Sequence, residues 1–190
     1  MKFTILLAFM AAGALAGPLH ATRQNKGKAG KAAAAKGNGN AATAAGDVTR
    51  GATTLVLKED GGVPGNECLT FRNNGEIVDA ACVNDAADRQ MTPSTLNGEN
   101  VLLVQRSFTA GFRSDLVNKQ ACVGNNGTTF LAQDCATVTD FVTFDDASGQ
   151  LVSAAGACQS GHDDAAQLTI DATGKNCATL TTTSVTATAP

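Results

Sequence analysis

The side chains best suited to chemistry gather in one short stretch near the C-terminal end of the chain. They are His162, Asp163, Asp164, Gln167 and Asn176. Carboxylates and amides can bind sugar hydroxyls through hydrogen bonds, and carboxylates can also ligate a cation. The stretch therefore indicates either a shallow sugar or cation site or a solvated acidic turn.

A second, smaller group occurs earlier in the chain. Asp79, Asn84 and Gln90 are spaced so that they could face one pocket. We therefore include these three residues with the first group as candidates for sugar binding.

Enzymatic chemistry has little basis in this sequence. The chain has 2 histidines, and His162 is the one that follows the N-terminal region. Ser160, His162 and Asp164 are near neighbours, whereas the members of a catalytic triad are aimed by separate elements. Adjacent carboxylates such as Asp163 and Asp164 do not have the separation that a glycosidase pair requires. We expect no enzyme, no cofactor and no metal site, since zinc-type CxxC and EF-hand spacings are also absent from the sequence.

The N-terminus predicts export. Residues 1–16 combine Lys2, an apolar stretch and the small-residue triplet at 14–16, which is typical of a secretory signal peptide. We therefore expect a secreted, extracellular protein that does not span a membrane.

Residues 17–52 form a basic leader rich in Ala, Gly and Lys that lacks the residues for a core. Within 21–50 it has six basic side chains and one acidic side chain, whereas 51–190 has 7 basic and 16 acidic ones. Such a segment is typical of a disordered spacer or pro-segment. A tether to an anionic polymer is the alternative, and nucleic-acid binding is disfavoured because the leader has no aromatic side chain to stack on a base.

The 6 cysteines recur in consecutive pairs, each after a run of Leu and Val. Leu55, Leu102 and Leu151 open the three units roughly 50 residues apart, so each unit has room for about four short strands. Fifteen disulfide connectivities are possible for six cysteines. The repeat favours the sequential one, which joins Cys68 to Cys82, Cys122 to Cys135 and Cys158 to Cys177.

Short runs of Val, Leu, Thr and Phe, broken by Gly, Asn and Asp, predict a single all-β domain over 53–190. The strands we expect are 54–58, 68–72, 77–82, 101–106, 121–123, 128–132, 141–144, 150–153, 167–170 and 178–183.

The order of strand, Cys, strand, Cys and strand, seen three times over about 53–190, resembles the ricin-B-type lectin module. Residues 149–158 read as turn, strand and Cys, and residues 130–135 as a strand ending in Asp-Cys. The resemblance implies a β-trefoil of three pseudo-repeats, each closed by a local disulfide. The middle repeat departs from the pattern by an insertion around 107–118.

The resemblance also implies where a sugar would bind. Family modules use an acidic residue shortly after the first cysteine, an aromatic ring two positions before the second, and polar side chains beyond it. The acid positions here hold Thr70, Gly124 and Ser160, and the ring positions hold Ala80, Gln133 and Lys175. Trp is absent from the chain, and Phe144 occupies the place of the family's core Trp in the second repeat.

Two functions follow as hypotheses. The first is a secreted carbohydrate-binding module with weak or altered sugar sites. The second is a secreted effector or inhibitor that binds a protein partner and does not bind sugar. The sequon Asn126-Gly127-Thr128 predicts glycosylation on the second repeat, which favours the first or third repeat for ligand binding. The composition resembles that of small secreted fungal proteins.

Overall fold

The computed structural model describes residues 48–189, and this part of the chain is all-β. The predicted signal peptide and most of the predicted leader lie outside the described residues. The domain prediction began at residue 53, but the strand β1 (Val48–Arg50) pairs antiparallel with β5 (Gln90–Leu96). The end of the predicted leader thus contributes a strand to the fold.

The remaining strands are short and follow one another through turns. In chain order they are β2 (Thr54–Val63), β3 (Asn66–Phe71), β4 (Ile77–Ala80), β6 (Glu99–Val104), β7 (Ala121–Asn125), β8 (Phe130–Asp134), β9 (Val142–Asp145), β10 (Gln150–Ser153), β11 (Cys158–His162), β12 (Leu168–Asp171) and β13 (Leu180–Val185). Helical turns are η1 (Ala87–Arg89), α1 (Ala110–Arg113) and η2 (Ser114–Leu116).

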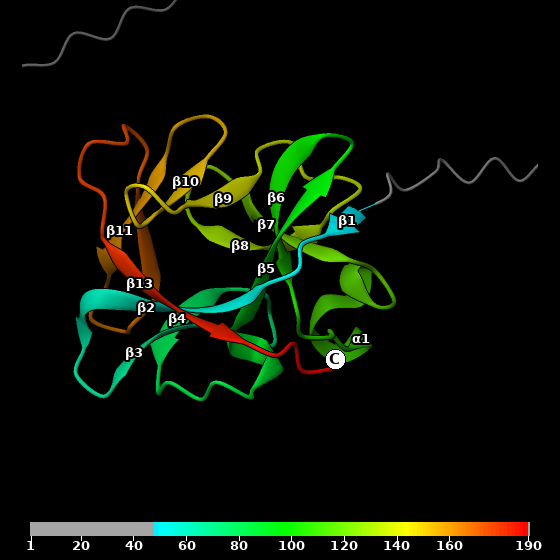
Figure 1. The fold of residues 1–190 in the computed structure, drawn as a ribbon, viewed down its shortest axis with the longest axis horizontal. Coiled ribbons are helices and arrows are strands. Elements are labelled where there is room, and N and C mark those ends of the chain that lie inside the picture. The colour runs from blue at the N-terminus through cyan, green and yellow to red at the C-terminus, as the bar shows by residue number, and fades with distance from the viewer. Residues whose placement is uncertain (1–47, 190) are drawn as a thin grey trace, which may run out of the picture. The chain divides into compact units, whose positions relative to one another are not determined.

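The strands form a nearly closed, barrel-like arrangement (Figure 1). One sheet runs in the order β4-β3-β2-β5-β6-β7-β8, with β1 added to β5 and β13 added to β2, and the second runs β12-β11-β10-β9. Isolated bridges join Glu76 to Leu131, Val78 to Gln167 and Gly124 to Phe141. The first bridge brings the two ends of the longer sheet together, and the other two connect the longer sheet to the shorter one.

Three antiparallel hairpins, β3–β4, β7–β8 and β11–β12, each carry one disulfide. The bridges join Cys68 to Cys82, Cys122 to Cys135 and Cys158 to Cys177, with sequence separations of 14, 13 and 19 residues. These are the predicted pairs. Each bridge closes a local loop, which stabilises the fold mainly by restricting the unfolded chain.

Two apolar clusters fill the described part of the chain, a main one and a smaller one around Leu96, Val101 and Leu103. The three leucines that open the predicted units, Leu55, Leu102 and Leu151, all belong to the main cluster, and Leu151 is fully buried. Phe144 is partly buried and packs against the same cluster. β2, β3 and β6 each carry four consecutive buried residues, so these strands are covered on both faces.

Two described strands beyond residue 53 were missed by the prediction, and each has a local reason. β5 contains Pro93, which cannot donate to a sheet ladder and lowers strand propensity. β11 reads Cys-Gln-Ser-Gly-His, a polar run in which the register shifts between Gln159 and Gly161. Tertiary pairing outweighs local propensity at both places.

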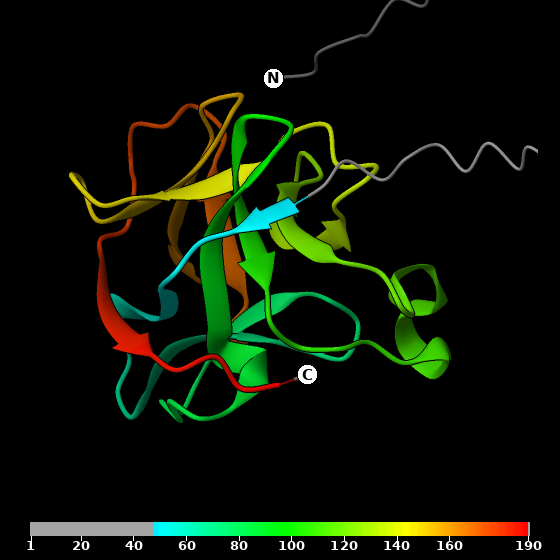
Figure 2. The same cartoon turned by 45° about the vertical axis from the view of Figure 1, so that its right-hand side comes forward.

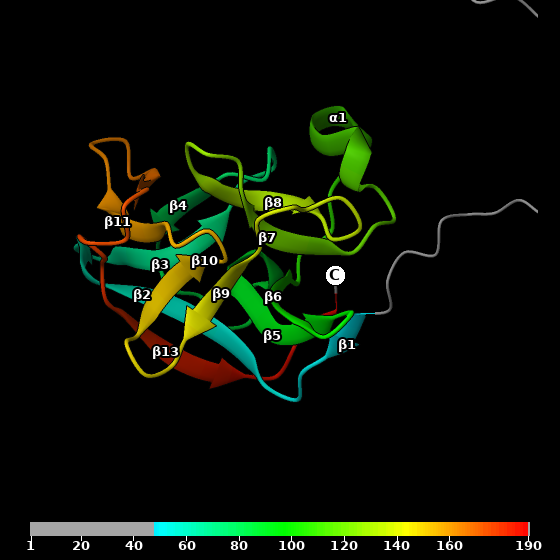
Figure 3. The same cartoon turned by 90° about the horizontal axis from the view of Figure 1, so that it is seen from above.

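The predicted insertion around 107–118 forms α1 and η2. This segment projects from the side of the barrel in two views (Figure 2, Figure 3). Leu116 anchors it, because its side chain is buried in the main core cluster.

We expect Leu151→Ala to lower the free energy of unfolding by about 2–5 kcal/mol, because the substitution leaves a cavity where the three units meet. Val83→Ala is the control, since Val83 is exposed, and it should change stability by about 0.5 kcal/mol or less. Chemical denaturation followed by circular dichroism measures both. Equal effects of the two substitutions would contradict the core described here.

Candidate functional site

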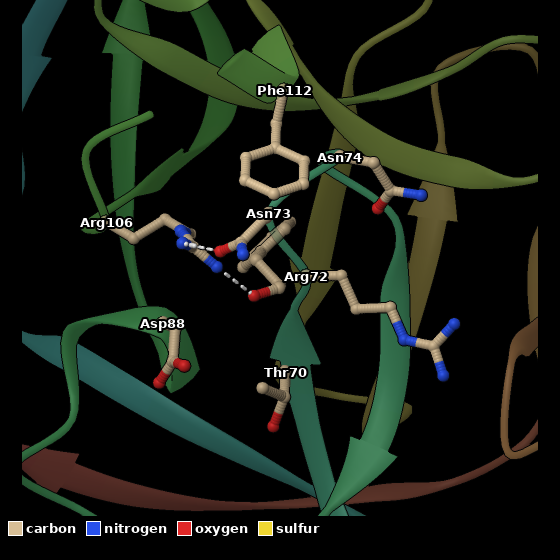
Figure 4. A pocket seen from close by; sticks show the side chains of 8 residues that line it. Thr70, Arg72, Asn73, Asn74, Asp88, Arg106 and Phe112 are labelled. Carbon is tan, nitrogen blue, oxygen red and sulfur yellow. Dashed lines mark hydrogen bonds between the residues drawn. The ribbon is translucent and has the colours of Figure 1, made fainter. Parts of the chain in front are cut away.

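An open hollow of about 530 Å³ lies where the β3–β4 turn meets the projecting insertion (Figure 4). This volume lies within the range of small-ligand sites, about 300–1,000 Å³. We call the hollow the Phe112 groove. Its lining residues are Thr70, Phe71, Arg72, Asn73, Asn74, Asp88, Arg106 and Phe112.

Arg106 is held in place on one side of the Phe112 groove. Its Nη1 donates a hydrogen bond to the backbone carbonyl of Phe71, and its Nη2 donates to Oδ1 of Asn73 over 2.7 Å (Figure 4). The guanidinium carbon also lies 5.2 Å from the centre of the Phe108 ring, a cation–π distance. Arg106 therefore orders the β3–β4 turn and presents a cation of restricted geometry.

Phe112 supplies the aromatic surface of the groove. It lies on α1, and 62% of its surface is exposed, which is unusual for so large an apolar side chain. In the close-up its ring lies above Asn73, with Arg106 to one side and Asp88 and Thr70 below (Figure 4). An exposed ring beside a carboxylate, a guanidinium and amides can cover an apolar face of a ligand while polar groups bind its rim.

The next residue, Arg113, fixes α1 against the barrel. Its Nη1 donates to the backbone carbonyls of Asn74 at 3.1 Å and Ala132 at 2.8 Å, and its Nε and Nη2 bind the carboxylate of Asp115. The space for this side chain depends on Gly75, where an added Cβ would lie 2.2 Å from Arg113 Nη1 and φ is +86°. The groove wall is thus positioned by contacts across 39 residues of sequence.

Opposite the ring, Asp88 provides the carboxylate of the groove. It lies on η1, and its Oδ1 accepts a hydrogen bond of 2.6 Å from Nη1 of Arg89. The other carboxylate oxygen is not engaged by this bond and can accept from a ligand. Thr70, at the acid position of the first repeat, lines the same groove.

The third-repeat candidates lie in separate places. Asp163 and Gln167 share a different hollow, of about 370 Å³, and Oδ1 of Asp163 accepts hydrogen bonds from the backbone N–H groups of Ala165 and Gln167. Asp164 is exposed.

Asn176 is engaged in a turn rather than in a ligand pocket. Its backbone and side-chain N–H groups both donate to Oδ2 of Asp171. Hydrogen bonds from the hydroxyl and N–H of Thr173 are the main cause that holds the pKa of Asp171 well below its ordinary value, and the bonds from Asn176 add to the effect. The side chain of Asn176 thus stabilises the loop between the third pair of cysteines.

The first-repeat candidates also separate. Gln90 is fully buried, and its amide binds the backbone carbonyl of Asn84 and both the hydroxyl and backbone N–H of Thr188. Gln90 thus ties the C-terminal segment to the barrel. The Asn84 side chain is exposed, and Asp79 lies in a separate buried cluster.

This cluster, which we call the acidic cluster, brings together Glu59, Asp79 and His162 from β2, β4 and β11. His162 Nδ1 lies 2.8 Å from Oε1 of Glu59 and 3.3 Å from Oδ2 of Asp79. Both carboxylates are buried, and Gln159 Nε2 donates to Oε2 of Glu59 over 2.6 Å. Two residues predicted for different repeats therefore meet at one site, next to a glutamate that the prediction did not include.

The environment of the acidic cluster shifts two pKa values upward. Burial, followed by the charge of Glu59, raises the pKa of Asp79 to about 6, and the charge of His162 offsets only part of this change. The hydrogen bond to Glu59 raises the pKa of His162, and the nearby charges of Asp79 and Asp163 act in the same direction. Asp79 and His162 therefore keep their protons to a higher pH in the folded protein than in the unfolded chain.

The sequon residue Asn126 is exposed in the loop between β7 and β8. Its Oδ1 accepts hydrogen bonds from Thr128 and Thr129, and Thr128 lines the hollow that contains Asp163 and Gln167. A glycan on Asn126 would therefore occupy space next to that hollow.

Sequence reasoning missed the Phe112 groove and Glu59. The one available signal for the groove was the insertion around 107–118, which places a Phe on a segment without the strand pattern. Glu59 has no such signal, because its neighbours in sequence resemble an ordinary charged strand end.

Comparison with protein-family models, with curated proteins and with solved structures finds no match for this chain. Within residues 48–189, no helix is both long enough and apolar enough to cross a bilayer.

We expect the free energy of unfolding to fall as pH rises from about 4 to 6. Asp79 has a folded-state pKa of about 6 against an ordinary 3.8, so in this window the folded state holds a proton that the unfolded chain has released. The raised pKa of His162 has the same sign at higher pH: the stability it adds is complete below 6.5 and is lost as pH passes the folded value. Glu67 adds a further negative charge near Asp79.

Asp79→Asn should remove the first decline and make the variant more stable than the parent above pH 6, by on the order of 2–3 kcal/mol at about 1.36 kcal/mol per pKa unit. Urea denaturation at several pH values measures this difference. The buffer contains a chelator so that no metal ion binds to the carboxylates. Asp164→Asn, at an exposed neighbour of His162, is the charge-matched control and should follow the parent. A parent curve that rises between pH 4 and 6 would contradict the expectation.

Proposed function

We propose that this chain is a secreted carbohydrate-binding module, built as a three-repeat β-trefoil of the ricin-B-lectin type, which binds sugar in the Phe112 groove. The observation that carries the proposal is the exposed Phe112 ring above a groove lined by a carboxylate, a guanidinium and amides.

The repeat part of the proposal rests on the three hairpins. Each has one local disulfide, and each unit contributes one leucine to the common core at Leu55, Leu102 and Leu151. Three stapled units around one interior fit a trefoil. Three disulfides in a chain of this size also support export, because such bonds persist in oxidising compartments.

The sugar part rests on chemical complementarity. A pyranose ring presents C–H groups on one face and hydroxyls around its edge. The Phe112 ring suits the apolar face, while Asp88 accepts from hydroxyls and Asn73 and Arg106 provide polar groups of fixed orientation. The restraint on Arg106 reduces the entropy lost on binding.

The position of the groove also supports this assignment. It includes Thr70, which lies shortly after Cys68, where the family resemblance places a sugar-binding acid. In this proposal Asp88 takes over the role of the missing acid, and Phe112 from the insertion takes over the role of the missing ring. Glycosylation of Asn126 would affect the hollow at Asp163 and leave the groove as the free site.

A protein-binding effector or inhibitor is the second candidate. The observation that favours it is the projection of Phe112 on an insertion that stands out from the barrel, since a protruding aromatic residue is a common anchor of protein interfaces. The two candidates share the same residue and differ in whether free sugar competes.

The test is a glycan array probed with the full chain, followed by calorimetry with the best oligosaccharide. We expect Phe112→Ala to weaken binding at least tenfold, about 1.4 kcal/mol, because the stacking surface is lost. Val83→Ala removes another exposed apolar side chain of the described part of the chain and should bind like the parent.

Three outcomes are decisive. Loss of glycan binding on Phe112→Ala alone supports the sugar site. Capture of a stoichiometric protein that oligosaccharide does not displace, and that requires Phe112, supports the second candidate. If both variants bind glycan at parental affinity, the sugar binds elsewhere and the groove proposal is wrong.

A further inference from the structure

The acidic cluster lies apart from the Phe112 groove and has no part in the function proposed above. Its three side chains come from β2, β4 and β11, strands that are distant in sequence. One donor atom from each of Glu59, Asp79 and His162 lies within 4.8 Å of the other two. Such convergence of two carboxylates and an imidazole within a fold is costly unless the charges are compensated.

Compensation by residues that the structure describes is incomplete. Asp79 has a relative exposure of 6%, and within residues 48–189 its carboxylate accepts no well-formed hydrogen bond, although Oδ2 lies 3.3 Å from Nδ1 of His162. Gln159 is fully buried, and its Oε1 also lacks a partner there. Buried polar atoms are nearly always satisfied in folded proteins, so Oδ1 of Asp79 and Oε1 of Gln159 indicate a group that the described chain itself does not supply.

Two glycines bring the backbone close to the carboxylates of the cluster. A Cβ added at Gly62 would lie 3.0 Å from Oδ2 of Asp79, and one added at Gly161 would lie 3.7 Å from Oε1 of Glu59. Glycine at both positions keeps side-chain atoms away from the oxygens. His162 is 24% exposed at its side chain, which provides a route from solvent to the cluster.

We propose that Glu59, Asp79 and His162 form a binding site for one divalent transition-metal ion of the Zn²⁺ class. The donors would be one oxygen of each carboxylate and Nδ1 of the imidazole, and water or Oε1 of Gln159 would complete the shell. Two carboxylates match the charge of a divalent cation. A dication thus neutralises both buried charges.

The donor set and its spacing select the type of metal. Imidazole nitrogen favours Zn²⁺ and its neighbours in the transition series over Ca²⁺ and Mg²⁺, which prefer oxygen alone. Donors of a tetrahedral Zn²⁺ site with bonds of about 2.0 Å lie about 3.3 Å apart. His162 Nδ1 is 3.3 Å from Asp79 Oδ2 and 2.8 Å from Glu59 Oε1, and the two carboxylate oxygens lie within 4.8 Å of each other, so the three donors would have to move by up to about 1.5 Å to reach this spacing.

Gln159 contacts Glu59 beside the proposed ion. Its Nε2 donates to Oε2 of Glu59, which leaves Oε1 of that glutamate directed at His162 and at the proposed ion. Metal ligands are commonly oriented by such outer hydrogen bonds. The ion would join β2, β4 and β11 and so act as a structural link between distant parts of the chain.

The experiment uses the full chain with its disulfides intact, stripped with chelator and titrated with Zn²⁺ by calorimetry, with bound metal counted by elemental analysis after dialysis. We expect one Zn²⁺ per chain and a rise in melting temperature with Zn²⁺. Asp79→Asn should weaken binding at least tenfold and abolish the rise. Asp164→Asn removes the same charge from an exposed neighbour and should bind as the parent does.

A second pair of variants tests the nitrogen donor. With Co²⁺ as a spectroscopic probe, His162→Gln should lose the visible absorption of a site with imidazole ligation, whereas His20→Gln, at the chain's other histidine, should retain it. Circular dichroism and the intact mass confirm that each variant is folded and bridged. If Asp79→Asn does not fold, Glu59→Gln replaces it in the titration.

Absence of stoichiometric Zn²⁺ binding by the parent would overturn the proposal. So would binding that Asp79→Asn or Glu59→Gln, together with His162→Gln, retains at parental affinity, because the metal would then lie elsewhere. Selective loss in these variants with retention in Asp164→Asn and His20→Gln supports it. None of these outcomes depends on whether the Phe112 groove binds sugar.

Discussion

The structure depends on the burial of apolar strand residues from distant parts of the described chain in a common interior. Leu55, Leu102 and Leu151 belong to the same cluster, although the outer two are separated by most of the described chain. An isolated pair of short strands is at best marginally stable in water, so the hairpins become stable only when they pack together. The pairing of β13 with β2 completes the arrangement by joining the last strand to one of the first.

The disulfides act at a different level from the core. Each bridge lies within one hairpin and restricts a short loop, so none of the three ties one unit to another. Contacts between units come instead from apolar packing, from isolated bridges such as Glu76 with Leu131, and from polar links such as Glu59 with His162. Because each disulfide stabilises its own hairpin, we expect the connecting loops and the insertion to tolerate changes without loss of the barrel. The Phe112 groove is formed in this way, by an insertion that is held to the barrel through Arg113 and Leu116.

Two polar sites of opposite character result. The Phe112 groove is open, with an exposed ring, and its polar groups are arranged around a surface. The acidic cluster is largely buried, and Asp79 in it accepts no well-formed hydrogen bond from the described residues. An open site with an apolar face suits an organic ligand that desolvates partly, whereas a small, charged, enclosed site suits an ion. The groove is lined by the β3–β4 turn and the insertion, whereas the cluster is built from side chains of β2, β4 and β11, so the two sites share no residue.

The sequence by itself determined the all-β class, the sequential pairing of the cysteines and the leucines of the core, because short apolar runs, turn residues and short cysteine spacing act over a few residues. It also located the insertion at 107–118 but not what the insertion does. Tertiary structure alone decided that His162 and Asp79 meet Glu59, that Gln90 is a buried tie to Thr188, and that Phe112 stands over the β3–β4 turn. Glu59 and His162 are separated by 103 residues, so their contact is set by how the strands close around the core and has no local signal.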